Sequence, residues 1–446
     1  MRIAVVGSGY VGLVSAACLA DSGHEVVCVD RDPSRLAAVR GGRAPFYEPG
    51  LNEILARQVG RRLEATGDLA AAVRSSDASL VCVGTPFDGE RIDLSAVEGA
   101  VREIGAALRG SRRWHTVVVR STVVPGTTDG LVRSVLESEA GRPIGDALGL
   151  ATNPEFLTEG SAVADFAQPD RIVIGTRDDR SRAALDEMYS TFSDVPRLYV
   201  SPREAELIKY ASNALLATAI SFANEIADLC EVVGEADVTR VMKGVHLSRY
   251  LTAQEPSDRG WTAPLASFLE AGCGYGGSCL PKDVRALVAE GRTWGLPMTL
   301  LRAVDEINRR RPERVLALLG KHFETLEGVP VTVLGLAFKP DTDDVRQTPA
   351  APVIDLLLDR KARVTVYDPV ALPRLRSLYP GGDVIAASSM QEAVREAAAV
   401  VLVTRWQEFA SLPDVLERLG VQPLVVDGRR MLDSSAFARY EGIGRG

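Results

Sequence analysis

The N-terminal residues constrain the fold more than any other part of the chain. An apolar run at residues 3–6 leads directly into Gly7, Gly9 and Gly12, and the next apolar run ends at Asp30. In a βαβ unit, the three glycines allow a tight turn, close approach of the backbone to a pyrophosphate, and close packing of helix on strand. Asp30 would accept hydrogen bonds from both ribose hydroxyls and repel a 2′-phosphate, so the pattern predicts NAD rather than NADP. The alternative, that the glycines serve packing alone, does not account for Asp30.

The apolar runs predict two doubly wound α/β domains joined by helices. We expect strands at residues 3–6, 26–29, 80–83, 117–120, 331–334, 363–367, 400–403 and 424–426. One long helix is expected at 203–233, with Leu207, Ala211, Leu215 and Phe222 on its apolar side, and a loop at 252–264. The expected domains are 1–200 (NAD-binding Rossmann), 201–322 (helical, dimerisation) and 323–446 (Rossmann-like, nucleotide-sugar-binding).

Composition narrows the choice of partners and compartment. The chain has 446 residues and a net charge of −8, with no long basic run, so nucleic acid is not expected as a partner. Apart from the glycine-containing N-terminal run, no apolar stretch approaches the ~20 residues that span a bilayer. The six cysteines form no CxxC pair, which favours a reduced, cytoplasmic protein without a metal site.

The segment from residue 274 to residue 283, GYGGSCLPKD, contains the most informative cysteine. We predict a glycine-rich loop that enters a helix, with Ser278 as N-cap and an end near Gly291. Cys279 would then lie at the helix N-terminus beside Lys282, and both features favour the thiolate. Asp283 would lie one turn further on the same face. The alternative is a buried, inert thiol, which is the usual state of an unpaired cysteine.

Two further groups of polar residues are candidates for chemistry. Lys209 and Asn213 are four residues apart on the long helix, so together they would hold an oxyanion; a solvated lysine is the alternative. After the expected strand at 149–152, Asn153 would cap a short helix on which Glu155 and Glu159 share a face. One of the two carboxylates would act as a base and the other would hold a binding partner. The alternative is that both are ordinary surface acids.

Long motifs in a fixed order resemble the UDP-glucose/GDP-mannose dehydrogenase family. They include GSGYVGLVSAACLA, YEPGL, STVVPGT, NPEFLTEGSAVADF, KYASNALLATAISFANE, GCGYGGSCLPKDV, GLAFKPDTDDVR and DGRR, and they cover nearly the whole chain. The resemblance implies a cytoplasmic homodimer that performs a metal-free, four-electron oxidation of UDP-glucose to UDP-glucuronate with two NAD⁺. It also implies that Cys279 captures the C6 aldehyde as a thiohemiacetal, which is oxidised to a thioester and then hydrolysed.

The resemblance assigns a role to each matching residue. Lys209 and Asn213 would stabilise oxyanions, Asp283 would assist proton removal through a water held by Thr122, and Glu159 would guide the hydrolytic water. The implied NAD site comprises Gly7, Gly9, Tyr10, Val11, Gly12, Asp30, Arg35, Thr85, Ser121, Thr122, Glu159, Lys282 and Arg346. The implied substrate site comprises Glu155, Phe156, Leu157, Glu159, Lys209, Asn213, Tyr275, Gly276, Cys279, Phe338, Lys339 and Arg429.

One region departs from the family pattern. The family's Asp-x-Arg-Ile-Gly, whose arginine reaches the partner subunit, is replaced by a longer segment that begins at His246 and Leu247. Arg249 and Arg259 are both candidates for that arginine, and His246 itself is expected to pack rather than catalyse. TDP-glucose, GDP-mannose or a UDP-N-acetylhexosamine is therefore an alternative substrate. A two-electron hydroxyacid-type dehydrogenase and a non-catalytic nucleotide-sugar-binding protein are alternatives of other classes.

Overall fold

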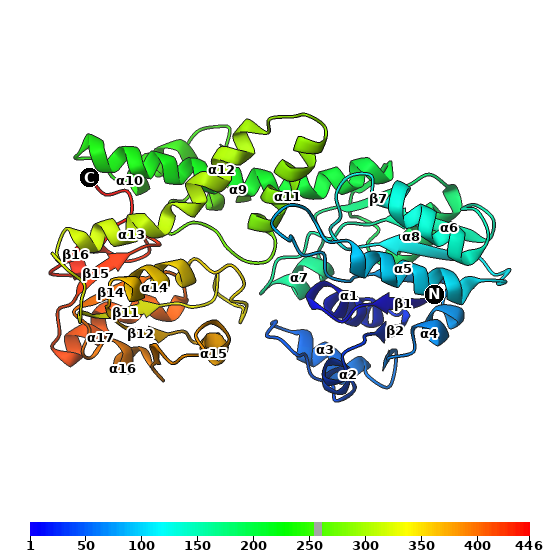
Figure 1. Ribbon diagram of the computed structural model, residues 1–446, viewed down its shortest axis with the longest axis horizontal. Helices are drawn as coiled ribbons and strands as arrows, with labels where there is room; N and C mark the ends of the chain where they lie inside the picture. Colours follow the sequence, from blue (N-terminus) through cyan, green and yellow to red (C-terminus); the bar gives the residue numbers. More distant parts are fainter. Residues whose placement is uncertain (254–260) are drawn as a thin grey trace. The chain divides into compact units, whose positions relative to one another are not determined.

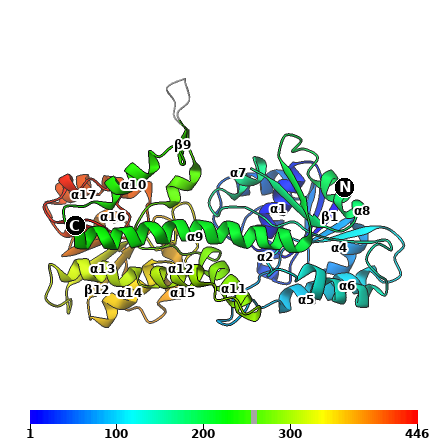
Figure 2. The same ribbon diagram turned by 90° about the horizontal axis from the view of Figure 1, so that it is seen from above.

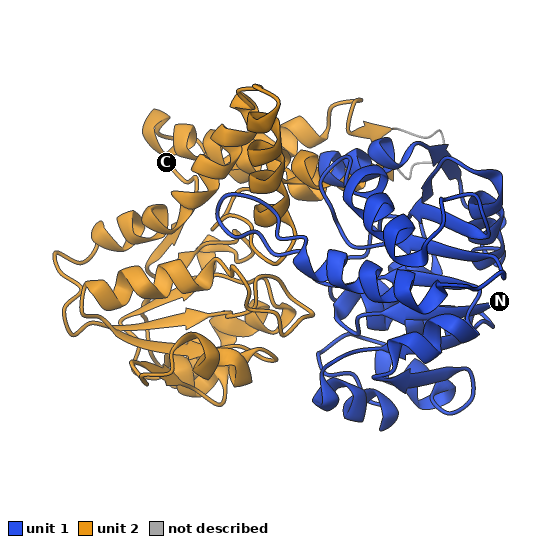
Figure 3. Cartoon of the chain, turned by 45° about the vertical axis from the view of Figure 1, so that its right-hand side comes forward, with its two compact units in different colours: residues 1–212 blue, residues 213–446 orange. Residues whose placement is uncertain are grey.

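The computed structural model describes residues 1–253 and 261–446. These residues form two compact units, 1–212 and 213–446 (Figure 3). The fold class predicted from the sequence, two Rossmann-like parallel sheets and a helical region with a long helix, is confirmed. The predicted domain boundaries, after residues 200 and 322, stay predictions.

Unit 1 is built on an eight-stranded sheet whose order is β3-β2-β1-β4-β5-β6-β7-β8 (Figure 1). Only the β6–β7 pairing is antiparallel. The inner strands are short and buried on both faces, as the runs of β-branched residues predict. The strands are β1 (Arg2–Val6), β2 (Glu25–Val29), β3 (Leu63–Thr66), β4 (Ala78–Val81), β5 (His115–Val119), β6 (Leu148–Thr152), β7 (Ile172–Thr176) and β8 (Arg197–Val200).

Helices connect these strands and cover the sheet. They are α1 (Tyr10–Asp21), α2 (Pro33–Arg40), α3 (Leu51–Gln58), α4 (Leu69–Ser75), α5 (Ser95–Leu108), the π-helix η1 (Thr128–Val132), α6 (Arg133–Ala140), α7 (Ala162–Ala167) and α8 (Asp179–Met188). Helix α1 packs against α3 and α7, so the cofactor-loop helix is in contact with two later segments of the chain.

The long helix α9 (Pro202–Val233) confirms the prediction for residues 203–233 (Figure 2). Its predicted apolar side is exposed to solvent in this chain, because Leu207, Leu215 and Phe222 keep 47%, 56% and 46% of their surface accessible. Exposed apolar side chains in such a row, seven or eight residues apart, form a continuous face along a helix. Neighbouring exposed apolar side chains of this kind are typical of an interaction surface.

Unit 2 combines helices with a six-stranded parallel sheet of order β13-β12-β11-β14-β15-β16. Its first part comprises α10 (Val238–His246), β9 (Thr252–Ala253), β10 (Trp261–Thr262), η2 (Pro264–Phe268), α11 (Leu280–Thr293), α12 (Thr299–Arg309) and α13 (Arg311–Gly320). The sheet strands are β11 (Pro330–Leu334), β12 (Arg363–Tyr367), β13 (Val384–Ala386), β14 (Ala399–Leu402), β15 (Leu424–Asp427) and β16 (Tyr440–Gly442). The helices beside them are α14 (Ala350–Asp359), η3 (Leu372–Arg374), α15 (Leu375–Leu378), α16 (Met390–Val394), η4 (Gln407–Ser411), α17 (Leu412–Leu419) and η5 (Ser434–Ala436).

Two local predictions in unit 2 are wrong. The expected loop at 252–264 contains a short antiparallel pairing of β9 with β10. The expected helix end near Gly291 falls inside α11, which continues to Thr293. A Cβ on Gly291 would lie 2.3 Å from Cγ of Met298, so this glycine makes room for a neighbouring side chain and does not end the helix.

Each sheet has an aspartate directly after one of its strands, but the two aspartates have different surroundings. Asp368 follows β12 as Asp30 follows β2, yet Asp368 is 1% exposed. Its carboxylate accepts hydrogen bonds from the backbone amides of Leu336, Ala337, Val370 and Ala371 and from the Trp406 indole. A carboxylate whose oxygens are all occupied in this way has no capacity left for a ribose.

Stability at mildly acidic pH should depend on His115 in β5. Burial lowers the pKa of His115 from 6.5 to about 4, and its ring contacts the Ser79 hydroxyl and the Ser76 carbonyl. The folded state therefore binds the proton less readily than the unfolded state, and stability is lost as the pH falls through this range. Between about pH 7 and about pH 5 the loss from His115 should be about 2 kcal/mol. Urea unfolding of wild type and His115→Gln at both pH values measures it; an equal loss in both proteins would refute the assignment.

Candidate functional site

The glycine loop between β1 and α1 has the shape that a dinucleotide requires. Gly7 has φ +104°, and a Cβ there would lie 2.8 Å from the Cys82 carbonyl oxygen. A Cβ on Gly12 would lie 1.9 Å from the Gly7 carbonyl oxygen, whereas one on Gly9 would meet no atom within 4 Å. Gly7 and Gly12 are thus needed for packing, and the open space beside Gly9 fits a pyrophosphate at the N-terminus of α1.

Asp30 lies at the end of β2, where the sequence analysis places the ribose contact. One carboxylate oxygen accepts from the Ser8 amide at 2.7 Å and the Ser8 hydroxyl at 2.5 Å, and the other accepts from the Asp32 amide. Burial alone would raise the pKa of Asp30, but these hydrogen bonds and the Arg35 guanidinium, 3.7 Å away, lower it below its ordinary value. Asp30 is therefore a fixed anion at the place where NAD's ribose would bind.

Three predicted cofactor residues lie on the loops that follow β4 and β5. The Thr85 hydroxyl donates to the Thr122 carbonyl at 2.7 Å, and the Ser121 hydroxyl donates to the Val83 carbonyl at 2.7 Å. These bonds join the carboxyl ends of neighbouring parallel strands, which is where ligands bind in such sheets.

Unit 1 contains a buried ion pair between two predicted site residues, Lys209 and Glu155. Lys209 of α9 lies 3.1 Å from Glu155, and each side chain is 5% exposed. The other Glu155 oxygen accepts from the Leu157 amide at 2.6 Å. The Phe156 ring stacks under Arg171 at 3.9 Å and lies 5.5 Å from the Lys209 ammonium. The predicted residues Glu155, Phe156, Leu157 and Lys209 are therefore gathered in one place.

The predicted helix that begins at Asn153 is absent, since residues 153–158 have no regular secondary structure. The Asn153 amide donates to the Val173 carbonyl, and its oxygen accepts from Arg120 and from the Tyr189 hydroxyl. These long-range partners occupy the side chain that would have capped the helix. Glu155 and Glu159 therefore do not share a helix face.

In unit 2, close approach of backbone atoms shapes the glycine-rich loop. A Cβ on Gly276 would lie 2.3 Å from the Gln347 carbonyl oxygen, and one on Gly277 would lie 2.7 Å from the Phe338 ring. The Gly277 amide donates to the Arg346 carbonyl at 3.1 Å. Tyr275, which is 7% exposed, is held through its amide by the Asn308 side chain at 2.8 Å. The loop is thus fixed against the 338–349 segment.

Cys279 is itself the N-cap of α11, which corrects the prediction that Ser278 caps this helix. The Ser278 hydroxyl instead lies 3.6 Å from the Cys279 sulfur. The other five cysteines are buried, and burial raises the pKa of each of their thiols. Among the described residues, Cys279 is the one cysteine that is partly exposed, at the positive end of a helix.

Asp283 lies one turn beyond the thiol on α11 and contacts two other predicted site residues, Asn213 and Lys282. Its carboxylate accepts from the Asn213 side-chain amide at 2.6 Å and from the Lys282 ammonium at 2.6 Å, and Asp283 is 1% exposed. The Asp283 amide donates to the Cys279 carbonyl, which places the carboxylate on the next turn of α11. Thiol, carboxylate and amide therefore belong to one rigid part of unit 2.

The predicted arginines of unit 2 differ in their surroundings. Arg429 is committed to the glycine-rich loop, because its guanidinium donates to the carbonyls of Gly274 and Val403. Arg346 is exposed and forms a bidentate pair with Asp344. Lys339 lies 6.0 Å from the Phe338 ring. Arg429 thus positions the loop, and the residue next to it, Arg430, faces a cavity.

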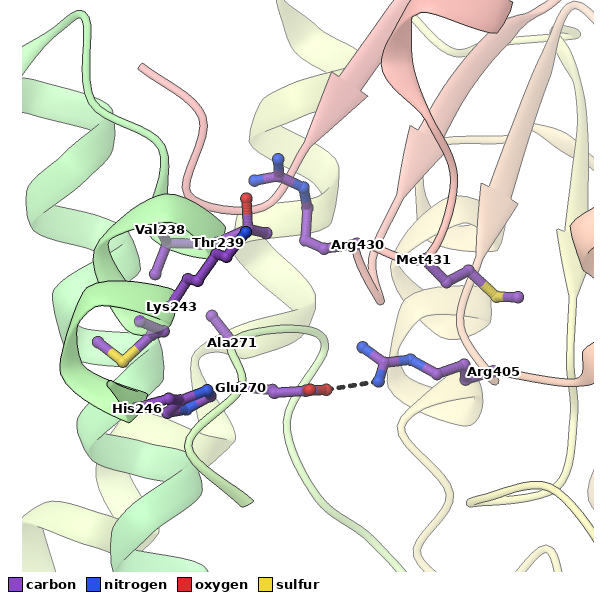
Figure 4. Close-up of a pocket in the computed structure, with 10 residues that line it drawn as sticks. Val238, Thr239, Lys243, His246, Glu270, Ala271, Arg405, Arg430 and Met431 are labelled. Atoms are coloured by element: carbon purple, nitrogen blue, oxygen red, sulfur yellow. Dashed lines mark hydrogen bonds and ion pairs between the residues drawn. The ribbon is translucent and has the colours of Figure 1, made fainter. Parts of the chain in front are cut away.

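This cavity, of about 420 Å³, lies between α10 and the segments around residues 270, 405 and 430 (Figure 4). Arg405 pairs with Glu270 across its rim, and Lys243 adds a further cation (Figure 4). The cavity has both charged and apolar lining residues. It is lined by Val238, Thr239, Met242, Lys243, His246, Glu270, Ala271, Arg405, Arg430 and Met431. The volume and the mixed lining suit an anionic ligand with a flat apolar part.

Motif analysis did not identify the residues that line the cavity, nor Glu48. Arg430 and the lining of the cavity come from four separated segments, and Glu48, within the quoted YEPGL, is a buried carboxylate beside the cofactor loop. Of the two arginines proposed for the missing family position, Arg249 is exposed and Arg259 lies outside the described residues.

Known proteins resemble this chain over nearly its whole length. Residues 1–193, 203–310 and 332–434 match the NAD binding, central and UDP binding domains of the UDP-glucose/GDP-mannose dehydrogenase family. The chain is 42% identical to UDP-glucose 6-dehydrogenase of Rhizobium meliloti and 35% identical to GDP-mannose 6-dehydrogenase of Pseudomonas putida, over 99–100% of the chain and the whole of each relative. It superimposes on UDP-glucose dehydrogenase of Pyrobaculum islandicum with a TM-score of 0.91 and 40% identity, covering 100% and 98% of the two chains.

No helix in the described part of the chain is long and apolar enough to cross a membrane.

The glycine loop yields a prediction in which two similar substitutions have different outcomes. Gly9→Ala should leave the melting temperature unchanged but weaken NAD⁺ binding at least ~10-fold, because the added methyl group enters the space assigned to the pyrophosphate. Gly12→Ala should destabilise the fold by about 2–4 kcal/mol, because its Cβ overlaps the Gly7 carbonyl. Calorimetry for binding and thermal unfolding separate the two effects.

Gly99→Ala, in open space inside α5, is the control: it should leave the NAD⁺ affinity unchanged and should not lower the melting temperature, because alanine is favoured over glycine in a helix interior. Wild-type NAD⁺ affinity in Gly9→Ala would contradict the assignment of this loop.

Proposed function

Because the chain belongs to the UDP-glucose/GDP-mannose dehydrogenase family and carries its NAD binding domain, we propose that it oxidises C6 of UDP-glucose to the carboxylate of UDP-glucuronate. Relatives that bear the name UDP-glucose 6-dehydrogenase, at 40–42% identity, support this substrate over GDP-mannose. The observation that carries the proposal is the pairing of Cys279, at the start of α11, with the buried Asp283 cluster one turn further.

In the proposed first oxidation, Asp283 accepts the proton of the C6 hydroxyl through a water molecule bound by Thr122. NAD⁺, when bound, accepts the hydride in each of the two oxidations. Asn213 and Lys282 hold the Asp283 carboxylate in place by donating to both of its oxygens. The Lys209 ammonium and the Asn213 amide stabilise negative charge on the substrate oxygen.

The Cys279 thiolate then adds to the aldehyde, so the intermediate stays bound as a thiohemiacetal while the cofactor is exchanged. Loss of the second hydride leaves a thioester on Cys279. In the last step water adds to the acyl carbon and the C–S bond breaks, which gives the uronate carboxylate, the thiol and one proton. We assign the orientation of this water to Glu159, which is 9% exposed.

Two groups of residues described above would bind the substrate: those that line the cavity beside Arg430 and those around Glu155. We propose that the nucleoside end occupies the 420 Å³ cavity, where Lys243 supplies positive charge for a diphosphate together with Arg430, which also pairs with Asp237 at 2.7 Å. The location of this cavity supports the proposal, because it adjoins the loop that leads to Cys279 and belongs to segments matched by the central and UDP binding domains. Glu155, Phe156, Leu157 and Phe338 would contact the sugar.

We propose further that the protein acts as a homodimer in the cytoplasm. The exposed face of α9 with Leu207, Leu215 and Phe222 supports the dimer, since two copies of one apolar helix face bury each other in an isologous contact. The reducing compartment is supported by the cysteines, which form no disulfide in the described part of the chain.

The chemistry is tested by counting electrons. With limiting sugar, wild type should form two NADH for each UDP-glucose, and UDP-, TDP- and GDP-sugars supplied in parallel identify the preferred substrate. Cys279→Ala should bind UDP-glucose but form no acid, because covalent capture is lost. Absorbance at the NADH band and chromatography of the sugar product measure both. One NADH for each sugar, or steady acid formation by Cys279→Ala, would overturn the thioester mechanism.

The oligomeric state gives a separate test. Leu215→Glu combined with Phe222→Glu should convert a dimer into a monomer, because each copy would bury charge at the α9 face. Ile385→Glu, an equally exposed apolar site on β13, should leave the mass unchanged. Sedimentation equilibrium distinguishes the two; a variant that keeps the wild-type mass would place the interface elsewhere.

A further inference from the structure

Glu48 is a buried carboxylate to which the proposed chemistry assigns no role. It lies in the loop between α2 and α3 and is 5% exposed. One of its oxygens accepts a short hydrogen bond from the Tyr10 hydroxyl and another from the Gly160 amide at 2.7 Å. The other oxygen accepts from the Val163 amide at 3.2 Å. In the described ranges 1–253 and 261–446, no cation lies within ion-pair distance of this carboxylate.

A carboxylate in such surroundings joins three separate segments of unit 1. Tyr10 is the first residue of α1, directly after Gly9, and its ring packs on Phe46 at 4.9 Å. Gly160 belongs to the turn that leads into α7, and Val163 lies in the first turn of that helix, which packs against α1 (Figure 1). Glu48 thus connects the cofactor loop with the turn that contains Glu159.

The contact with Gly160 is the one that matters for chemistry. Gly160 has φ +85°, so the chain reverses directly after Glu159 in a conformation that glycine adopts most readily. The amide that Glu48 and Tyr10 bind belongs to the peptide bond between Glu159 and Gly160. The orientation of that peptide fixes where the Glu159 side chain begins, and Glu159 is buried beside Tyr10, whose pKa its charge helps to raise.

We propose that Glu48 is a positioning residue for Glu159, and through it for hydrolysis of the thioester on Cys279. This inference rests on the proposed function, which assigns the hydrolytic water to Glu159. The step consumes one water, breaks the C–S bond, and releases the carboxylate, the Cys279 thiol and one proton. The role assigned to Glu48 is to orient, through the Gly160 amide, the backbone from which Glu159 acts.

The neutral variant Glu48→Gln keeps the shape of the side chain but turns an N–H₂ group towards one of three converging donors. Glu48→Ala removes all three bonds. Both variants should form the first two NADH in a rapid burst at a rate within ~2-fold of wild type, because Glu48 bonds only to Tyr10 and to the Gly160 and Val163 amides among the described residues, and to none of the groups assigned to hydride loss. Steady turnover should fall at least ~10-fold in Glu48→Gln and further in Glu48→Ala, because hydrolysis becomes limiting.

Intact-protein mass spectrometry of quenched reactions should then show an acyl adduct that accumulates on Cys279 in the variants but not in wild type. Their turnover should also rise with pH as hydroxide replaces the oriented water, a response that a loss of folding would not produce. Glu53→Gln, an exposed acid on α3, is the matched control and should behave as wild type.

The outcomes separate this inference from the proposed function. If wild type forms two NADH for each sugar and the Glu48 variants turn over like Glu53→Gln, Glu48 has no positioning role. If the variants lose the burst as well as turnover, without an adduct, their defect is general and the inference is wrong. If wild type itself forms one NADH and no adduct, the proposed function has failed, whatever the variants do.

Discussion

The arrangement of unit 2 depends on a constraint of space around the loop that precedes Cys279. Side chains at Gly276 or Gly277 would collide with the Gln347 carbonyl or the Phe338 ring, so the loop can follow its path only without them. That path ends at the first turn of α11, where Cys279 caps the helix and Asp283 follows one turn later. Arg429 holds the same loop from the other side through the Gly274 carbonyl. A thiol held by backbone packing needs little further organisation before it reacts.

The patterns that were predicted from sequence are those with local causes. Buried parallel strands, the glycine loop of α1, the long helix and the position of Cys279 at a helix start all follow from periodicity and from turn chemistry within a few residues. The failed helix at Asn153 shows the limit. Its side chain bonds to Arg120, Tyr189 and the Val173 carbonyl, and these partners lie 20 to 36 residues away in the chain. Gly291 fails for a related reason: Met298 occupies the space where its Cβ would be.

The parts of the candidate site that escaped prediction are assembled from distant segments. The cavity beside Arg430 draws its lining from four stretches of unit 2, and Glu48 contacts Gly160 across 112 positions of sequence. No motif with a fixed spacing describes such contacts, and single residues within YEPGL or DGRR do not reveal their partners. The apolar face of α9 is the opposite case, since its periodicity was evident but its exposure could be known only from the fold.

The five hydrogen bonds on Asp368 have a consequence for how the molecule responds to its ligands. Because that carboxylate is satisfied from within, the second sheet is complete without a dinucleotide, while the Asp30 side chain in the first sheet keeps 11% of its surface accessible. NAD⁺ should therefore raise the resistance of unit 1 to unfolding, by about 2.7 kcal/mol at one hundred times its dissociation constant, and leave unit 2 to respond to the nucleotide sugar. The two halves of one chain would then report the levels of two different metabolites through their protection against proteolysis.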